Sequence, residues 1–211
     1  MTSVRGMFSN TTRRILAMSI TTMIAGAAGC ATSTPQRVYI GTYTKGWACD
    51  QNDCTSKGIY RADFDPASGK LSGLAVAAES ENPSYLTVHP NGKFLYAVNE
   101  LGDWKGDKTG AVSAFAIEPS GDLRLLNQLS SFGADPCHIS LTSSGKEVLV
   151  ANYSGGSVAS YTIGEDGQLQ EGSNVKHSGK SVHKNQEAPH AHYITESPQK
   201  AGMIYVADLG I

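Results

Sequence analysis

Charge is sparse in this chain, and it forms no basic face. Only 17% of the 211 residues are Asp, Glu, Lys or Arg, and 8% are aromatic. Three of the 17 basic residues and none of the 19 acidic ones lie within residues 1–29, so the remainder carries 14 basic against 19 acidic residues, a net charge of −5. Nucleic-acid-binding domains need a basic patch or stripe. Because no run of Lys or Arg occurs, we expect no nucleic-acid partner.

Long hydrophobic runs and helical patterns are also missing. No window after residue 35 shows the apolar spacing of an amphipathic helix. The apolar stretch at residues 15–25 is interrupted by Ser and Thr and is too short to cross a bilayer stably. Glycine is abundant instead, with 23 residues, which suits an all-β protein with many tight turns.

The amino end is typical of an export signal. A basic start is followed by the apolar stretch and then by Ala27-Ala28-Gly29-Cys30, the order found in secretory signal peptides. Small residues before a cysteine resemble a bacterial lipoprotein signal, so we expect removal of residues 1–29 and lipidation of Cys30. Ordinary cleavage nearby, with Cys30 incidental, is the alternative. The prediction is an exported periplasmic or cell-envelope protein, held to the membrane only through Cys30, with a linker over residues 30–37.

Cysteine is scarce, with four residues in the chain. Cys49 and Cys54 bracket a short acidic segment, residues 50–53, and an exported protein can form a disulfide across such a loop. A metal site in this loop is the weaker alternative. Cys137 is left over and is expected to act as a small buried apolar residue.

One phrase recurs at a constant interval. Its copies begin at Pro83, Pro136 and Pro189, so they lie 53 residues apart both times. A second phrase recurs between them, with a glycine before each predicted strand and a Ser-Gly or Asp-Gly turn after it. Repeats of this length that contain several short strands indicate stacked or radial repeat units.

Each unit is predicted to contain four strands joined by tight turns. Asn-Gly, Ser-Gly and Asp-Gly supply the positive φ that hairpins require, and the segments between them are rich in Val, Ile, Tyr, Phe and Ala. Four strands in about 50 residues predict one blade of a β-propeller. A β-sandwich is the alternative, but it would not repeat its phrases so regularly. Three blades are expected over residues 36–188, and the opening of a fourth from Pro189.

A propeller ring closes, and so avoids exposed strand edges, typically from four blades upward. We therefore expect residues 38–211 to be an incomplete β-propeller of about three and a half four-stranded blades, the amino-terminal portion of a longer protein. The alternative is a short chain that closes by dimerisation, and the oligomeric state stays open.

Several phrases together resemble one known family. They are Val38-Tyr39-Ile40-Gly41-Thr42-Tyr43-Thr44, Asn82-Pro83-Ser84-Tyr85-Leu86, His89-Pro90-Asn91-Gly92, Ala151-Asn152-Tyr153-Ser154-Gly155-Gly156, Gln186-Glu187-Ala188-Pro189-His190-Ala191-His192 and Val206-Ala207-Asp208-Leu209-Gly210. In combination they resemble the propeller lactonase family, which includes bacterial 6-phosphogluconolactonase of the β-propeller type and the carboxy-muconate lactonising enzyme. The resemblance covers residues 38–211. It implies seven blades in the full protein, a small-molecule lactone substrate, and no obligatory metal or other cofactor.

Hydrolysis of a lactone needs a base that activates water and donors that hold the carbonyl oxygen. His190 and His192 lie two positions apart on a predicted strand, so both side chains should point to one face, toward the central channel. Imidazole has a suitable pKa for a base near neutral pH. These two residues are therefore the candidate catalytic residues. A metal pair and a structural role between blades are the open alternatives.

Four further residues are candidates for binding the substrate. His138 follows Pro136 by two residues, so the constant interval aligns it with Ala191 and places it at the same opening. Strand ends can present polar groups, and three such groups come at corresponding places after predicted strands: Glu100, Asn152 and Asp208.

Two functions follow from these patterns. The first is hydrolysis of a sugar lactone such as 6-phosphogluconolactone, a step of carbohydrate metabolism. The second is a non-catalytic, envelope-anchored binding or scaffolding propeller, because propellers host both kinds of function. An export signal conflicts with a sugar phosphate lactone, which is a cytosolic metabolite. Either another lactone is the substrate, or the resemblance reflects ancestry rather than activity.

Overall fold

Antiparallel strands make up the regular structure of the described residues. The computed structural model describes residues 35–46, Cys49 and residues 54–211. The expected signal peptide over residues 1–29 and the lipidation site Cys30 lie outside these residues. No helix long and apolar enough to span a membrane occurs in the part of the chain that the structure describes.

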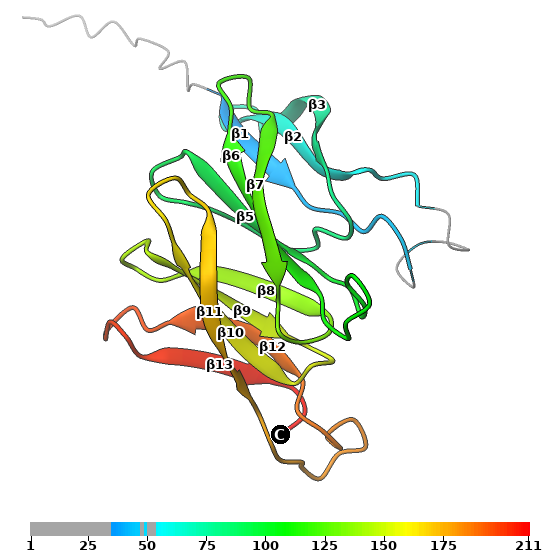
Figure 1. Cartoon of the computed structure of the whole chain (residues 1–211). Helices are drawn as coiled ribbons and strands as arrows, with labels where there is room; N and C mark the ends of the chain where they lie inside the picture. Colours follow the sequence, from blue (N-terminus) through cyan, green and yellow to red (C-terminus); the bar gives the residue numbers. More distant parts are fainter. Residues whose placement is uncertain (1–34, 47–48, 50–53) are drawn as a thin grey trace, which may run out of the picture. The chain divides into compact units, whose positions relative to one another are not determined.

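The strands form four sheets, and strands that are consecutive in sequence are neighbours in each sheet (Figure 1). The first sheet consists of β1 (Gln36–Ile40), β2 (Gly58–Asp65) and β3 (Lys70–Glu79). The second consists of β4 (Leu86–Val88), β5 (Phe94–Asn99), β6 (Ala111–Ile117) and β7 (Leu123–Ser130). The third consists of β8 (Pro136–Leu141), β9 (Glu147–Asn152), β10 (Ser157–Ile163) and β11 (Leu169–Lys176). The fourth consists of β12 (Ala191–Glu196) and β13 (Ile204–Asp208).

These sheets correspond to the predicted repeat units. The second and third sheets each have the four strands that the repeat predicts, and the expectation of an all-β chain of successive blades is confirmed. Among the described residues, the first sheet has three strands and the fourth has two.

Glycine provides the hairpin turns inside the sheets. Gly92 lies between β4 and β5 with a φ of 69°, and Gly121 lies between β6 and β7 with a φ of 87°. Residues with a Cβ enter this left-handed region only at a cost in free energy. The Asn-Gly and Ser-Gly pairs of the sequence therefore act as turns, as predicted.

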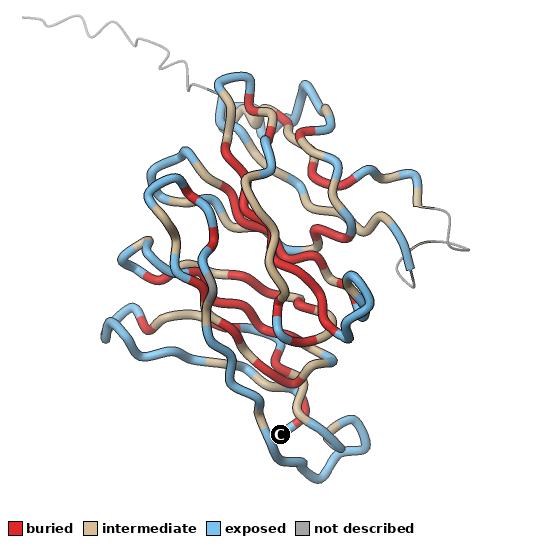
Figure 2. The backbone as a smooth tube through the Cα atoms, in the orientation of Figure 1, coloured by how far each residue is buried: buried red, intermediate tan, exposed pale blue. Residues whose placement is uncertain are grey.

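Hydrophobic side chains fill the spaces between successive sheets. Buried residues run along the middle strands of the second and third sheets (Figure 2). One cluster joins these two sheets, with Tyr96 and Val112 on one side and Ile139 and Tyr161 on the other. Similar clusters join the first sheet to the second and the third to the fourth. The inner sheets thus bury both faces, as blades that pack face to face require.

Two tyrosines link neighbouring sheets in the same way. Tyr39 on β1 donates its hydroxyl hydrogen bond to the carbonyl of Gly121, at 2.9 Å, and Tyr96 on β5 donates to the carbonyl of Gly167, at 3.1 Å. β1 therefore occupies the place in the first sheet that β5 occupies in the second. Within the described residues, the first sheet begins at the strand that is second in the later sheets.

The first strands of the later sheets lie side by side. β8 contacts both β4 and β12, and the hydroxyl of Ser140 on β8 donates a hydrogen bond to the carbonyl of Ile194 on β12, at 2.8 Å. The successive sheets therefore meet along these strands, which we call the hub strands: β4, β8 and β12.

Strand pairing corrects the alignment of the third copy of the repeat. Equivalent pairs in the three later sheets are Leu86 with Ala97, Ile139 with Val150, and Ile194 with Val206. Equivalent hub-strand positions thus lie 53 and then 55 residues apart. The loop between β9 and β10 is seven residues shorter than the loop between β5 and β6, whereas nine more residues separate β11 from β12 than β7 from β8. As a result, Ala191 rather than Pro189 corresponds to Pro136. His138 corresponds to Tyr193, so its predicted alignment with Ala191 is wrong.

Candidate functional site

A cavity of about 460 Å³ opens where the sheets meet at the hub strands. We call it the hub cavity, and its lining residues are Tyr43, Ser84, Tyr85, Glu100, Cys137, Tyr153, His192 and Leu209. A larger surface groove of about 630 Å³ lies among the outer turns around His89 and Lys146. The candidate site is the hub cavity, because it draws polar side chains from all four sheets to one place.

Two repeating positions supply most of the lining of the hub cavity. The first position lies at the start of each hub strand, and it holds Ser84, Cys137 and His192. The second position directly follows the second strand of the later sheets, and it holds Glu100, Tyr153 and Leu209. Tyr43 takes the matching place in the loop after β1. The fold therefore places the same two positions of every repeat at the hub, and the repeats differ in the chemistry they present there.

Glu100 is held by hydroxyl groups from two sheets. Its Oε2 accepts hydrogen bonds from the hydroxyl of Tyr43, at 2.8 Å, and from the hydroxyl of Ser84, at 2.5 Å. Its Oε1 accepts no hydrogen bond from the described part of the chain, so one carboxylate oxygen is available to a ligand. Burial, and then the hydrogen bond to Glu100, raise the pKa of Tyr43 to about 12. Tyr43 therefore keeps its proton and remains a donor at neutral pH.

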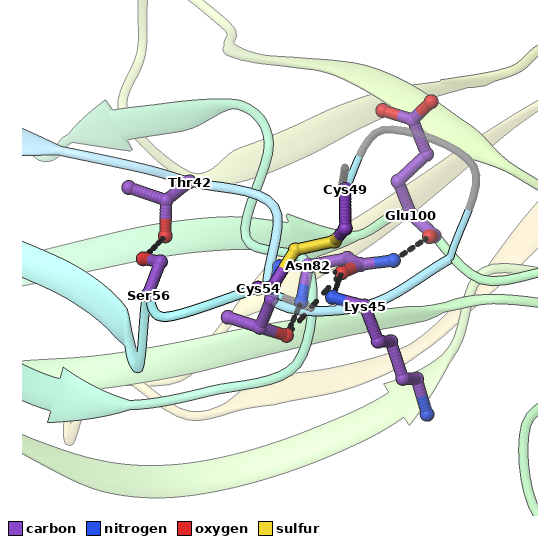
Figure 3. The surroundings of a disulfide bond; sticks show 8 residues. Thr42, Lys45, Cys49, Cys54, Ser56, Asn82 and Glu100 are labelled. Atoms are coloured by element: carbon purple, nitrogen blue, oxygen red, sulfur yellow. Dashed lines mark hydrogen bonds between the residues drawn. A yellow bond between two sulfur atoms is a disulfide. The ribbon is translucent and has the colours of Figure 1, made fainter. Parts of the chain in front are cut away.

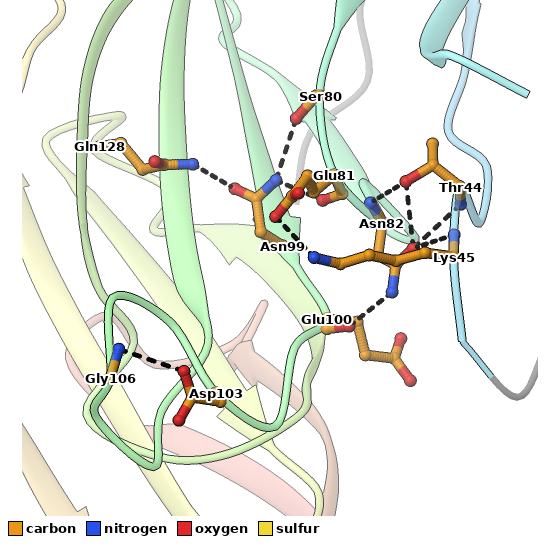
Figure 4. Close-up of polar contacts among 10 residues, drawn as sticks. All are labelled: Thr44, Lys45, Ser80, Glu81, Asn82, Asn99, Glu100, Asp103, Gly106 and Gln128. Carbon is orange, nitrogen blue, oxygen red and sulfur yellow. Dashed lines mark hydrogen bonds and ion pairs between the residues drawn. The ribbon is translucent and has the colours of Figure 1, made fainter.

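Asn82 holds the backbone of two loops that meet beside this carboxylate, one at Glu100 and one at Thr44 and Lys45. Its side-chain amide donates to the carbonyl of Glu100, at 3.0 Å, and its Oδ1 accepts from the backbone amides of Thr44 and Lys45, at 2.9 and 3.0 Å (Figure 4). Lys45 itself is turned to an ion pair with Glu81, 3.0 Å between Nζ and Oε2. The loop that carries Tyr43 is thereby tied to the loop that carries Glu100.

Cys49 and Cys54 form a disulfide beside the same loop (Figure 3). This is the pairing that the sequence predicts, although residues 50–53 between them lie outside the described residues. The loop is also closed by Thr42, whose hydroxyl bonds to the hydroxyl of Ser56, at 2.5 Å. The disulfide thus lies next to the segment that presents Tyr43 to the hub cavity.

His192 lines the hub cavity, whereas His190, two positions earlier in the sequence, does not. His192 is exposed and meets the ring of Tyr153 edge-on, with 5.6 Å between ring centroids and 90° between planes. His190 stacks on Tyr153, and its Nδ1 lies 3.2 Å from the backbone oxygen of that residue. The same-face rule predicts a shared direction, but it applies only within a regular strand. His190 precedes β12, and β12 has a bulge between Ala191 and Tyr193.

His138 lies behind the wall of the hub cavity. Its ring is buried between Tyr85 and Tyr193, with centroid distances of 4.4 and 4.2 Å, and its Nδ1 accepts a hydrogen bond from the amide of Ile194 at 3.3 Å. Burial, and then the nearby imidazole of His192, lower the pKa of His138 to about 4. His138 is therefore neutral at pH 7 and packs as an aromatic ring, outside the set of lining residues where the sequence predicts it.

Asn152 and Asp208 occupy one repeating position, one residue before the lining position, and both point into the fold. Asn152 is fully buried and donates to the carbonyl of Ser131, at 2.9 Å. Asp208 accepts hydrogen bonds from the amides of His190 and Gly210, at 2.7 and 2.8 Å, and its Oδ2 lies 2.6 Å from Nδ1 of His177. The structure therefore gives both predicted substrate ligands structural contacts instead of places in the cavity wall.

The electrostatics of Asp208 agree with its role as an anchor. Burial by itself raises the pKa of this carboxyl, but the hydrogen bonds from His177 and from the two amides outweigh it and lower the pKa below the ordinary value. The carboxylate is the stable form at neutral pH, and it joins the loop after β11 to the end of β13.

Sequence reasoning missed Tyr43 and the place of Cys137 in the cavity wall. Tyr43 lies in an irregular loop, and only its position in the repeat, matching Glu100, could have found it. Cys137 is half-buried, and its thiol lies 3.6 Å from the carbonyl oxygen of Ala191. Burial, and then the charge of Glu100, raise the pKa of this thiol to about 12. Cys137 therefore remains a neutral thiol, unsuited to nucleophilic catalysis.

The lining of the hub cavity offers a carboxylate, an imidazole and several hydroxyl groups, but no Lys or Arg among the described residues. Three metal-ligating His, Cys, Asp or Glu side chains do not converge anywhere in the described residues. A carboxylate and an imidazole can accept protons from water or sugar hydroxyls, and phenol hydroxyls can donate to oxygen. The arrangement can therefore bind a small polyhydroxylated molecule and move a proton at it.

Known proteins resemble this chain over the whole propeller region. Residues 37–211 match the model of the family described as Lactonase, 7-bladed beta-propeller. A 6-phosphogluconolactonase of Bacillus subtilis is 38% identical over 175 residues, covering 82% of this chain and 46% of the relative, and one of Formosa agariphila is 31% identical over 176 residues, covering 82% and 47%. The structure of a periplasmic gluconolactonase of Pseudomonas aeruginosa superimposes with a TM-score of 0.73 at 33% identity, covering 84% and 48%. The chain spans about half the length of the curated relatives it matches.

Proposed function

The chain belongs to the lactonase family of seven-bladed β-propellers, and we propose that the whole protein hydrolyses a sugar lactone, 6-phosphogluconolactone or a related aldonolactone. The observation that carries the proposal is the convergence of His192 and Glu100 in one cavity at the hub. The names of relatives support the reaction type, since two of them are 6-phosphogluconolactonases and one structure is a gluconolactonase.

We assign the role of general base to His192. It lines the cavity and is exposed, so water can reach its ring. The imidazole takes a proton from water while the water oxygen bonds to the lactone carbonyl carbon. The bond between that carbon and the ring oxygen then breaks, and the imidazolium returns its proton to the departing oxygen. A free hydroxy acid results, and His192 is again neutral.

Glu100 and Tyr43 form the polar wall that orients the substrate in this proposal. Oε1 of Glu100 is free to accept a hydrogen bond from a sugar hydroxyl, while Oε2 is already held by Tyr43 and Ser84. A carboxylate whose second oxygen is fixed in this way keeps its direction without further ordering, which lowers the entropic cost of binding. His190 positions Tyr153 from behind the cavity wall and takes no proton from water.

Hydrolysis can be tested directly with the full-length protein. Glucono-δ-lactone and 6-phosphogluconolactone open spontaneously, so the measured quantity is the rate above that of buffer, followed by acid release at constant pH. We expect acceleration with at least one of the two lactones. If neither these nor other aldonolactones open faster than in buffer, the non-catalytic envelope-anchored binding module becomes the better assignment.

We further propose that the protein is exported and lipidated at Cys30. The basic and apolar residues before Cys30 support this, and the structural relative of Pseudomonas aeruginosa is a periplasmic protein. Mass spectrometry of the protein from its native membrane fraction should show a diacylated Cys30 as the first residue. The variant Cys30→Ala should appear in the soluble fraction, and an unmodified Cys30 in the wild type would refute the anchor.

A further inference from the structure

Glu100 gives the hub cavity a fixed negative charge. Two hydroxyl groups hold its Oε2, and Asn82 holds its backbone carbonyl at 3.0 Å. The side chain therefore cannot turn away from a ligand without breaking hydrogen bonds to two different sheets.

No cation of the described residues neutralises this charge. The ion pairs of the described chain involve other carboxylates, and Lys45, which lies in the neighbouring loop, is engaged with Glu81 at 3.0 Å. The cavity wall itself contains no Lys or Arg among the described residues. An unpaired carboxylate in a partly enclosed site repels a second anion more strongly than it would in open water.

The charge of Glu100 affects the pKa values of residues from neighbouring sheets. After burial, it is the charge of Glu100 that raises the pKa of the Cys137 thiol, on β8 of the third sheet. After burial, hydrogen bonding to Glu100 and its charge also raise the pKa of Tyr43, which lies in the loop after β1 of the first sheet. Both shifts have the sign that a negative charge produces, because it disfavours a second anion nearby.

We propose that Glu100 acts as a charge filter, selecting lactones without an anionic group over phosphorylated or carboxylated ones. The proposal rests on the lactonase function and narrows its substrate class to neutral aldonolactones. A sugar hydroxyl can donate to Oε1 of Glu100, whereas a phosphate or carboxylate on the substrate is negatively charged at neutral pH and meets a like charge. Glu100 is in this sense a specificity-determining residue.

The test compares one neutral and one phosphorylated lactone with the full-length protein. kcat/KM is measured for glucono-δ-lactone and 6-phosphoglucono-δ-lactone, and their ratio is compared in the wild type, in Glu100→Gln and in Glu100→Asp. We expect the wild type to favour the neutral lactone, Glu100→Gln to shift the ratio about tenfold toward the phosphorylated one, and Glu100→Asp to keep the wild-type preference. The variant Glu118→Gln removes one partly exposed negative charge in the turn between β6 and β7, outside the lining of the hub cavity, so it controls for net charge and should leave the ratio unchanged.

Binding of the non-hydrolysable lactam analogues of both sugars, measured by calorimetry, separates this proposal from the lactonase function. If the wild type accelerates the hydrolysis of neither lactone, the lactonase function is refuted. The relative affinities for the two lactams still test the charge filter in that case. Two results overturn the charge filter: a wild type that prefers the phosphorylated ligand, or a Glu100→Gln ratio equal to that of the wild type. An equal shift in Glu118→Gln also overturns it, because the effect would then come from net charge alone.

Discussion

The imidazole of His190 is stacked on the phenol ring of Tyr153, with 4.6 Å between ring centroids and 21° between planes. The same phenol is met edge-on by His192, and Tyr153 and His192 both line the hub cavity. The two histidines are two positions apart in sequence, yet His192 lines the cavity, whereas His190 contacts the lining residue Tyr153 from behind. Their substitutions should therefore have different effects.

His192→Gln should lower kcat for lactone hydrolysis by about 100-fold or more, the usual contribution of a general base. The amide of Gln can still form hydrogen bonds but cannot take a proton from water near neutral pH. Initial rates at saturating lactone measure the change. A His192→Gln enzyme with wild-type kcat would remove the assigned base.

His190→Gln is the matched control for that substitution. It removes the stacked ring behind Tyr153 and leaves the cavity lining otherwise intact, so we expect a loss of activity below about tenfold, smaller than a lost proton acceptor causes. Thermal unfolding of both variants shows whether either loss reflects the fold. Equal losses of kcat in the two variants would contradict the assignment of His192 as the general base.

His138 should make the stability of the protein depend on pH. Its pKa is about 4 in the folded state, held down first by burial and then by His192, and about 6.5 in an unfolded chain. Between these values the unfolded state binds a proton that the folded state does not. The free energy of unfolding should therefore fall as pH falls from about 6.5 to about 4, by up to about 1.4 kcal/mol per pH unit, and should gain nothing from His138 above that range.

Urea unfolding at pH 7.5, 6, 5 and 4.5 measures this slope. In His138→Gln the side chain does not titrate but can still accept the hydrogen bond from the amide of Ile194, now made at 3.3 Å. We expect a flatter pH dependence in this variant. The same slope in variant and wild type would show that other groups cause it.

Asp208→Asn should weaken the end of β13. The Asn side chain keeps one acceptor oxygen for the amides of His190 and Gly210 but loses the carboxylate oxygen that lies 2.6 Å from Nδ1 of His177, and only 6% of the Asp208 side chain is exposed. We expect a loss of about 1–3 kcal/mol in the free energy of unfolding at pH 7, the range for a buried hydrogen-bonded charge.

The pH dependence of that loss provides a check. Because the pKa of Asp208 is lowered in the folded state, its contribution is present above the ordinary Asp pKa of about 3.9 and is lost as pH falls through the lower folded value. The difference in the free energy of unfolding between the wild type and Asp208→Asn should therefore become smaller in acid. Asp103→Asn is the control: Asp103 is exposed and accepts from the amide of Gly106 at 3.1 Å, a bond that Asn can also accept, so its effect should stay within about 0.5 kcal/mol.

Gly41→Ala should force the first two sheets apart at the hub. A Cβ at Gly41 would collide with the carbonyl oxygen of Pro83 and lie 3.3 Å from Cγ of Leu86. We expect a loss of about 1–3 kcal/mol in the free energy of unfolding, as for overpacked cores. Gly102→Ala is the matched control, since its Cβ would meet only the Asp135 side chain, at 3.6 Å, and should cost less than about 0.5 kcal/mol. Similar midpoints of urea unfolding for both variants would contradict the close approach of Gly41 to Pro83.

The blades could be predicted from the sequence because each has its own local signals. The Asn-Gly and Ser-Gly turns and the strand segments between them recur, and a hairpin needs little information from distant parts of the chain. Glu100 and His192 could be proposed as site residues on the same basis, since residues at corresponding points of a repeat reach the same place in the fold. Both line the hub cavity.

The remaining site residues depend on contacts that a repeat does not encode. His190 precedes β12, so the side-chain alternation of a regular strand does not extend to it, and its ring stacks on Tyr153 instead of lining the cavity. Asp208 turns inward as Asn152 does at the corresponding strand end, and its Oδ2 lies there 2.6 Å from Nδ1 of His177, from a loop 31 residues earlier. Tyr43 reaches the cavity from an irregular loop. The contacts of Asp208 and the place of Tyr43 are tertiary effects, beyond propensity and spacing.

The long loop before β12 also suggests how one blade can acquire chemistry of its own. Nine more residues separate β11 from β12 than β7 from β8, yet Ile194 stays in the interior beside Val206. Strand pairing sets the register of a strand, so the connections between blades can change in length while the hydrophobic layers stay in place. At the position where its neighbours carry a serine and a thiol, this blade has acquired an imidazole.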